Sequence, residues 1–205
     1  MEKSLKSKAV HVLDKAVRVI TIAPVMALLL LLSLYFFAPE QGITLVQLLF
    51  AVFFLTVLPV SAYPLQPLVP GFKDKGRKGQ RDLAIIAAVL GYIGGILHCV
   101  FFGAPEVLLV VYLCYLMSGV MIALFSKFTP IKASGHACGI AGPIAAATYY
   151  LGPWALLGTV LFAVVLVSSL RMKRHTLPEF LIGGAISVIG MFLSIRIAAL
   201  IMSLI

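Results

Sequence analysis

Residues 106–126 read EVLLVVYLCYLMSGVMIALFS, and no charged residue follows Glu106 until Lys127. An apolar run of about 18 or more residues is long enough to cross the hydrocarbon core of a bilayer as an α-helix. The rest of the chain has the same character, because 62% of its 205 residues are hydrophobic and only 11% are charged. The short alternating segments typical of a transmembrane barrel do not occur in the sequence. The sequence therefore predicts an all-α integral membrane protein.

Seven hydrophobic segments are expected, so the predicted fold class is a polytopic bundle of six to seven transmembrane helices. We interpret residues 1–205 as a single membrane domain, in which 1–66 supplies two N-terminal helices and 67–205 forms the core. The segment 136–151 is short and rich in Gly and Ala, and small residues let helices pack closely, so we expect it inside the bundle. The expected spans are 17–38, 44–66, 83–103, 106–126, 136–151, 154–170 and 179–203.

The charges of the connecting segments predict the orientation of these spans. Lys and Arg occur in the N-terminal arm and in loops 67–82, 127–135 and 171–178, whereas the other loops and the C-terminal tail carry none. By the positive-inside rule the N-terminus is cytoplasmic and the C-terminus is outside, in what we expect to be the plasma membrane of a prokaryote. This rule and anionic lipids also account for the net charge of +9. We therefore expect membrane lipids as partners, and no nucleic acid.

The stretch KASGHACG, residues 132–139, interrupts the apolar pattern at the start of the fifth segment. A helix N-terminus presents unpaired N–H groups and a partial positive charge, which favour an anion. Gly135 allows a backbone N–H to approach a phosphate oxygen, and the Ser134 hydroxyl can donate a further hydrogen bond. Alternatively, Ser134 is only the N-cap of the helix, which stabilises it by about 1 kcal/mol.

The stretch RMKRHTLPE, residues 171–179, places His175 beside basic residues on the same predicted side as His136. Two histidines can divide phosphoryl transfer, because one attacks phosphorus as a neutral imidazole and the other protonates the leaving oxygen. Glu179 follows His175 by four residues and can orient its ring and stabilise the imidazolium. Thr176 and Glu179 also form a T-x-x-E capping box, which explains the carboxylate without catalysis. The two roles are compatible.

These motifs resemble those of the type 2 phosphatidic acid phosphatase superfamily, which also includes vanadium haloperoxidases. The family pattern is K-x6-R-P, then P-S-G-H, then S-R-x5-H-x3-D. This chain has ASGH at 133–136 and H-x3-E from His175 to Glu179, with two predicted helices between the motifs. The resemblance covers roughly residues 67 to 200 and implies the helical bundle of that family.

The sequence departs from the family pattern in two motifs. In the first, Lys75 lies six residues before Arg81, one short of the pattern, and Asp82 stands where the proline is expected. In the third, Ser169 occupies the position of the expected arginine. Basic residues near that position that could replace it are Arg171, Lys173 and Arg174.

The resemblance implies a metal-independent lipid phosphatase that needs no cofactor and forms a phosphohistidine intermediate. His175 is expected to be the nucleophile and His136 the general acid, with Glu179 supporting His175. A cytoplasmic site favours phosphatidate, phosphatidylglycerophosphate or a prenyl diphosphate as the substrate. The residues expected to bind the phosphoryl oxygens are Lys132, Ser134, Gly135, Arg171, Arg174, Lys75, Lys78 and Arg81.

Two other functions are compatible with the same residues. A transporter of an anionic substrate would use the basic residues as a funnel, with His98 and Arg196 along its path. Such transporters are typically built from paired repeats with broken helices, and no repeat is visible here. A catalytically inactive membrane scaffold is the other alternative, because the first motif and the third-motif arginine are altered. The sequence does not indicate the oligomeric state.

No metal site is expected from the sequence. The three cysteines, Cys99, Cys114 and Cys138, form no C-x-x-C pair, and no His or Cys pair has the spacing of metal ligands. We therefore interpret the cysteines as small, buried, apolar residues.

Overall fold

The computed structural model describes residues 2–204, with side chains from Val10 to Leu204. Helices make up 86% of the structure and no strand occurs in the described range, which confirms the all-α prediction. The α-helices are α1 (Glu2–Ile20), α2 (Ala23–Phe37), α3 (Leu45–Val52), α4 (Leu58–Leu65), α5 (Gly76–Phe102), α6 (Glu106–Phe128), α7 (Gly135–Leu151), α8 (Gly158–Arg171) and α9 (Leu177–Met202). Short helical turns are η1 (Pro39–Gln41), the π-helical η2 (Phe53–Val57), η3 (Gln66–Leu68), η4 (Lys73–Lys75) and η5 (Pro153–Leu157).

Within residues 2–204, five helical segments are long and apolar enough to cross a membrane, and the bent pair α1–α2 makes a sixth if it is counted as one span. This agrees with a polytopic bundle, at the lower end of the six to seven helices expected. The helix α7 has 17 residues and coincides with the predicted segment 136–151. The helix α5 begins at Gly76 rather than at residue 83. The basic stretch that follows Gly76 is therefore the first part of this helix and not a loop. The five segments are Leu45–Leu68, Lys73–Phe102, Glu106–Phe128, Pro153–Arg171 and Leu177–Met202.

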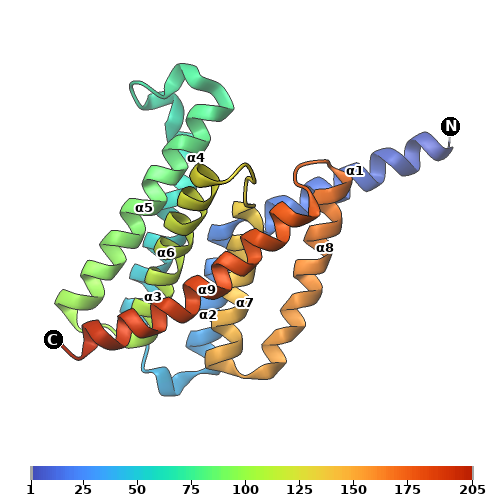
Figure 1. Ribbon diagram of the computed structural model, residues 1–205. Coiled ribbons are helices and arrows are strands. Elements are labelled where there is room, and N and C mark those ends of the chain that lie inside the picture. The colour runs from blue at the N-terminus through green and yellow to red at the C-terminus, as the bar shows by residue number, and fades with distance from the viewer. Residues whose placement is uncertain (1, 205) are drawn as a thin grey trace.

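The helix α7 lies inside the bundle, where it packs against α2, α6, α8 and α9 (Figure 1). All of residues 137–143 are buried, which confirms the prediction for this segment. The glycines allow this packing: a Cβ on Gly139 would collide with Ala23 of α2, and one on Gly142 would collide with Ser187 of α9. Small residues at helix contacts are typical of membrane proteins, since close backbone approach replaces the hydrophobic driving force available in water.

The connections sort by charge onto the two ends of the bundle (Figure 1). The α4–α5, α6–α7 and α8–α9 connections lie at one end, together with the junction of α1 and α2. The α2–α3, α5–α6 and α7–α8 connections and the end of α9 lie at the other. All the basic loops therefore share one end, as the span count predicted. That this end faces the cytoplasm remains a prediction.

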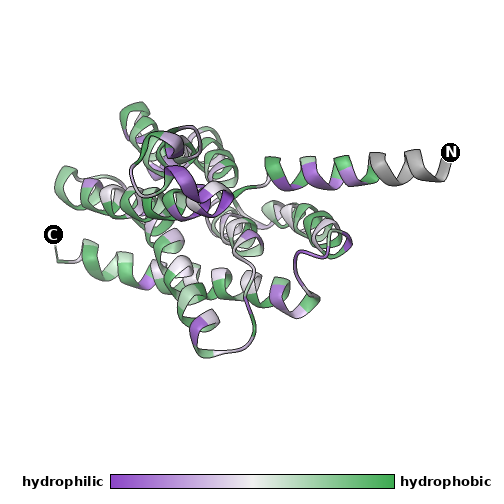
Figure 2. Ribbon diagram, turned by 90° about the horizontal axis from the view of Figure 1, so that it is seen from above, coloured by the Kyte–Doolittle hydropathy of each residue, from purple (hydrophilic) through white to green (hydrophobic). Residues whose placement is uncertain are grey.

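The predicted first span, 17–38, is wrong in one respect, because the helix is interrupted at Thr21 and Ile22. The axes of α1 and α2 differ by 57°, and α1 extends away from the bundle (Figures 1 and 2). Pro24 explains the break, since a proline ring clashes with the carbonyl group four residues earlier, here that of Ile20. Only α2 therefore continues into the apolar bundle, and α1 has a separate role.

The separation of the two ends predicts the result of thiol labelling in intact cells or sealed vesicles. Lys78→Cys lies at the basic end and should react only with reagent on the cytoplasmic side. Glu40→Cys lies at the opposite end and should react only with reagent outside. Background should be low because the native thiols are buried at Cys99, Cys114 and Cys138. Labelling of both positions from one side would refute the arrangement of spans, and exchanged sides would reverse the orientation.

Candidate active site

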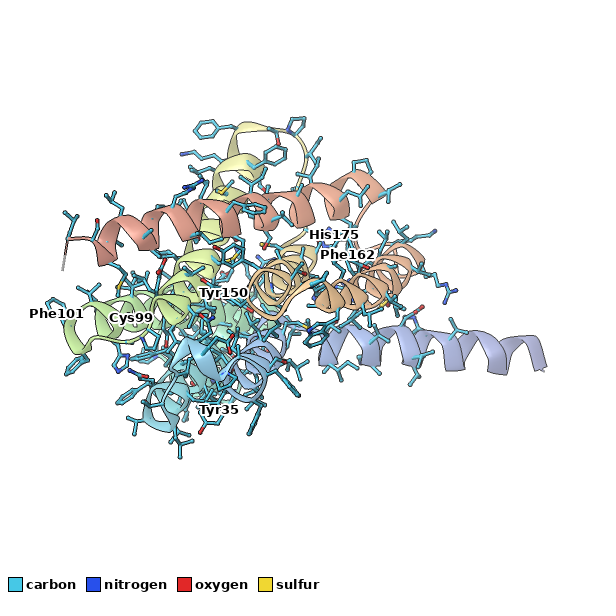
Figure 3. All side chains as sticks on the ribbon, turned by 90° about the horizontal axis from the view of Figure 1, so that it is seen from below. Tyr35, Cys99, Phe101, Tyr150, Phe162 and His175 are labelled. Carbon is cyan, nitrogen blue, oxygen red and sulfur yellow. The ribbon has the colours of Figure 1, made fainter. Side chains whose placement is uncertain are left out.

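Both predicted histidines lie at the basic end of the bundle, on adjacent helices. His136 is in the first turn of α7 and is half-buried. His175, labelled in Figure 3, lies in the α8–α9 connection, two residues before the start of α9. The residue two positions before His136, Ser134, is hydrogen-bonded to Glu179, four residues after His175, so the two motifs are in direct contact. The structure therefore brings together the two residues that the sequence assigned to one site.

A backbone contact sets the register between the two motifs. The N–H of Ser134 donates a 2.9 Å hydrogen bond to the carbonyl oxygen of Glu179. One turn further along α9, Gly183 lies so close to the backbone of Ser134 that a Cβ would collide with it. The segment before α7 is thereby fixed against the first turns of α9, and the positions of both histidines follow from this contact.

Ser134 is the N-cap of α7, as the alternative interpretation proposed. Its Oγ accepts a 3.3 Å hydrogen bond from the N–H of Ala137, and the residue is fully buried. Gly135 is exposed, and a Cβ built on it would meet no atom within 4 Å. Of this pair, Ser134 shapes the helix start, whereas Gly135 leaves open space beside the backbone where an anion could approach.

Glu179 combines the two roles that the sequence suggested for it. One of its oxygens, Oε2, accepts a 2.9 Å hydrogen bond from the N–H of Thr176, and the Glu179 N–H is paired with the Thr176 hydroxyl at 3.5 Å. The same Oε2 lies 3.5 Å from Nδ1 of His175. A carboxylate beside Nδ1 favours a proton on that nitrogen and leaves the lone pair on Nε2. Glu179 thus orients His175 with Nε2 as its basic nitrogen.

His136 has the opposite arrangement, because its Nε2 is bound by Thr21 at 3.0 Å. The Thr21 hydroxyl donates its one hydrogen to the carbonyl oxygen of Val17 at 2.7 Å. It can therefore only accept from the imidazole, which assigns a proton to Nε2 of His136. This partner was missed at the sequence level, since Thr21 lies in a predicted span far from either motif.

A second residue from the same region, Arg18, also joins the site. Its Nη1 donates a 2.8 Å hydrogen bond to Oγ of Ser169, the position where the family pattern expects an arginine. Arg18 lies one turn before Thr21, whose hydroxyl contacts His136. In the sequence Arg18 counted only toward topology, and the single signal of its role was the gap left by Ser169.

Three basic residues predicted to bind phosphate, from the α6–α7 and α8–α9 regions, are placed differently from one another. Arg174 belongs to the cluster, and its backbone N–H donates to the carbonyl oxygen of Ser169 at 3.0 Å. Arg171 instead lies 3.9 Å from the carboxylate of Asp14 on α1, so its charge is paired there. Lys132 is exposed to solvent beside the start of α7. Arg174 is therefore the best placed of the three.

The structure does not bring the three predicted ligands of the first motif to the histidines. They lie on η4 and the first turns of α5, which packs against α4 and α6, whereas α8 packs against α1 and α7. Figures 1 and 2 show this region and the α8–α9 connection on different sides of the bundle. Local contacts occupy two of them, since Lys75 lies over the ring of Phe72 and Arg81 lies 3.7 Å from Asp82. The residues concerned are Lys75, Lys78 and Arg81.

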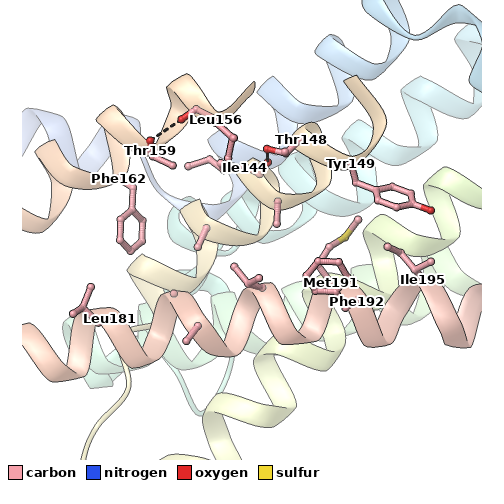
Figure 4. A pocket seen from close by; sticks show the side chains of 15 residues that line it. Ile144, Thr148, Tyr149, Leu156, Thr159, Phe162, Leu181, Met191, Phe192 and Ile195 are labelled. Atoms are coloured by element: carbon pink, nitrogen blue, oxygen red, sulfur yellow. Dashed lines mark hydrogen bonds between the residues drawn. The ribbon is translucent and has the colours of Figure 1, made fainter. Parts of the chain in front are cut away.

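An apolar groove of about 720 Å³ lies between α7, α8 and α9 (Figure 4). Leu181, two residues beyond Glu179, and Phe162 line the end nearer the site, and Ile195 lines the far end. Exposed apolar side chains such as Val188 line its open side, so a bilayer lipid could enter laterally. A second cavity, of about 500 Å³, lies between α5, α6 and α7 and reaches Gly135.

No protein-family model, no curated protein and no solved structure matches the chain. The resemblance to phosphatidic acid phosphatases therefore rests on the two histidine motifs. Among the side chains of residues 10–204, no cluster of three His, Cys, Asp or Glu residues is arranged to hold a metal ion.

Gly183→Ala tests the contact that joins the two motifs. The added methyl group would overlap the backbone of Ser134, so we expect a loss of stability of about 1–3 kcal/mol. Thermal unfolding of the protein in detergent should show a midpoint lower by several degrees. Gly119→Ala is the matched control, since a Cβ on Gly119 of α6 would meet no atom within 4 Å. Equal midpoints for the two variants would contradict the close contact.

Proposed function

We propose that the chain is a membrane lipid phosphatase that hydrolyses a phosphomonoester or diphosphate through a phosphohistidine intermediate. The observation that carries the proposal is the opposite hydrogen bonding of the two histidines. Glu179 lies at Nδ1 of His175, which leaves Nε2 basic, and Thr21 holds Nε2 of His136. Two nearby imidazoles with complementary proton arrangements are suited to nucleophilic attack and proton transfer in one site.

The proposed reaction has two steps. Nε2 of His175 attacks phosphorus and the bond from phosphorus to the lipid oxygen breaks, while the protonated His136 delivers a proton to that oxygen from Nδ1, the nitrogen that Thr21 does not hold. Water then attacks the phosphohistidine with His136 as the base, which releases inorganic phosphate and restores both rings. Glu179 stabilises the positive charge that develops on His175 during attack. Atoms and charge balance without any other reactant.

The surrounding charges support a phosphate-bearing substrate. Arg18 and Arg174 lie beside the histidines and would attract a dianion, since charge-assisted hydrogen bonds are about twice as strong as neutral ones. Burial of His136, together with the charge of Arg18, opposes a positive charge on its ring. We therefore expect His136 to take up its proton when the substrate binds, because the phosphate brings a negative charge beside it.

The groove between α7, α8 and α9 supports a lipid substrate rather than a soluble one. Its end at Leu181 lies two residues from Glu179, so a phosphate at the histidines could have its chain in the groove. The residues of the transporter alternative do not line this groove or the second cavity. His98 stacks on Phe50 and Phe102, and Arg196 is exposed on α9. This placement favours the phosphatase over an anion path through the bundle.

Release of phosphate from lipid phosphates tests the proposal directly. The purified protein, with a chelator present, should hydrolyse at least one of phosphatidate, phosphatidylglycerophosphate and a prenyl diphosphate. His175→Ala should abolish turnover because the nucleophile is lost, and His136→Ala should slow it roughly 10²- to 10⁴-fold. His11→Ala is the control, since His11 is exposed on α1 away from the cluster. Full activity of His175→Ala would eliminate the nucleophile assignment, and an inactive wild type would favour a scaffold.

Filling the groove should separate long-chain from short-chain substrates. Ala185→Trp places an indole in the groove between α7, α8 and α9, and we expect hydrolysis of a long-chain substrate to fall about tenfold or more through a raised KM. A short-chain phosphate ester should be hydrolysed nearly as well as by the wild type. Ile189→Trp, exposed on α9 outside the groove, serves as the control. Equal losses on both substrates would show that the groove does not hold the chain.

A further inference from the structure

The helix α1 lies outside the region that carries the family resemblance, yet it is tied to α8 by polar contacts. Oγ of Ser168 donates a 3.0 Å hydrogen bond to the carbonyl oxygen of Asp14. The Asp14 carboxylate, which is nearly buried, faces Arg171 of α8 at 3.9 Å. Arg18 follows one turn later and donates to Ser169. These contacts fix the last turns of α1 against α8, next to the two histidines.

Arg18 is half-buried among positive charges. Its guanidinium and the backbone N–H of Arg174 both bond to Ser169. Among residues 10–204 no carboxylate lies within ion-pair distance of it. Removing a cation from water without a counter-ion is costly, and further cations nearby add to that cost. Asp14, the nearest acid on the same helix, is directed to Arg171 instead. A bound anion would balance this arrangement.

The geometry of Arg18 suits such an anion. A guanidinium has five N–H donors in a planar fork, which matches the oxygens of a phosphate. The bond to Ser169 uses Nη1 and holds the group in place, so other donors remain to bind oxygens. Thr21 lies three residues further on and contacts His136, which places the end of α1 at the reacting groups.

The exposed side chains of α1 suggest how this helix is held in a position that brings Arg18 to the site. Val12, Leu13, Val19 and Ile20 are exposed apolar side chains, whereas the exposed polar residues His11 and Lys15 lie on another side of the helix. Separate apolar and basic faces are typical of a helix that lies along a membrane surface. The bend of 57° at the start of α2 allows α1 to leave the direction of the bundle.

We propose that Arg18 binds the phosphoryl oxygens of the substrate, so that α1 completes the site and supplies the guanidinium that α8 lacks at Ser169. This inference rests on the proposed function, because it assigns a ligand within that site. It adds a phosphate-binding residue from outside the two histidine motifs and makes the docking of α1 a condition for binding.

Binding of inorganic phosphate to the detergent-purified full chain tests the inference apart from turnover. Arg18→Ala should weaken phosphate binding roughly 10- to 100-fold and raise KM for the lipid substrate by a similar factor, because charge-assisted bonds to the anion are lost. Lys15→Ala, which removes an exposed cation one turn before Arg18, should bind phosphate like the wild type. Ser169→Ala removes the same hydrogen bond but leaves the guanidinium, so its affinity should fall less than that of Arg18→Ala.

The possible outcomes distinguish the two proposals. If Arg18→Ala binds phosphate as the wild type does, or if Ser169→Ala loses as much affinity as Arg18→Ala, Arg18 is only structural and the inference is overturned. Failure of the wild type to bind phosphate overturns it as well. If the wild type binds phosphate in an Arg18-dependent way but hydrolyses no lipid phosphate, the anion site stands and the phosphatase proposal fails. Comparing thermal midpoints ensures that only folded variants are compared.

Discussion

The contact between α7 and α9 is the constraint on which the rest of the structure depends. In a bilayer, helices gain little by hiding apolar side chains from one another, so close approach of small residues has to hold them together. Gly142 meets Ser187 in the middle of this contact, and Gly183 meets Ser134 at its basic end. The second of these places the start of one helix against the first turns of the other. Each of these two helix starts carries one histidine motif.

Polar contacts then arrange the charges at this end of the bundle. A capping box would be enough to start α9, yet the carboxylate of Glu179 also reaches His175. The hydroxyl of Thr21 similarly serves the end of α1 and the ring of His136. Such shared groups couple the local structure of helix ends to the orientation of the imidazoles. A capping role is therefore no argument against a role in the site.

Some of the site could be predicted because its residues are close in sequence or share a loop pattern. His175 and Glu179 are four residues apart, and one turn of helix is enough to bring them together. His136 and His175 could be placed on one side because charge patterns fix the side of every loop. The same rule holds for Lys75, Lys78 and Arg81. These residues nevertheless lie on η4 and the start of α5, across the bundle from the two histidines. Charge patterning predicts the end of the bundle but not the position of a residue within that end.

The sequence by itself determined the helical membrane architecture, the sorting of basic loops to one end and the two histidine motifs, because apolar length, charge and short spacing are local properties. The tertiary structure decided which distant residues meet these motifs. Arg18 reaches Ser169 across most of the chain only because Pro24 breaks the helix and α1 docks on α8. No local pattern encodes a contact between helices so far apart in sequence. Packing and polar contacts between α1 and α8 bring them together.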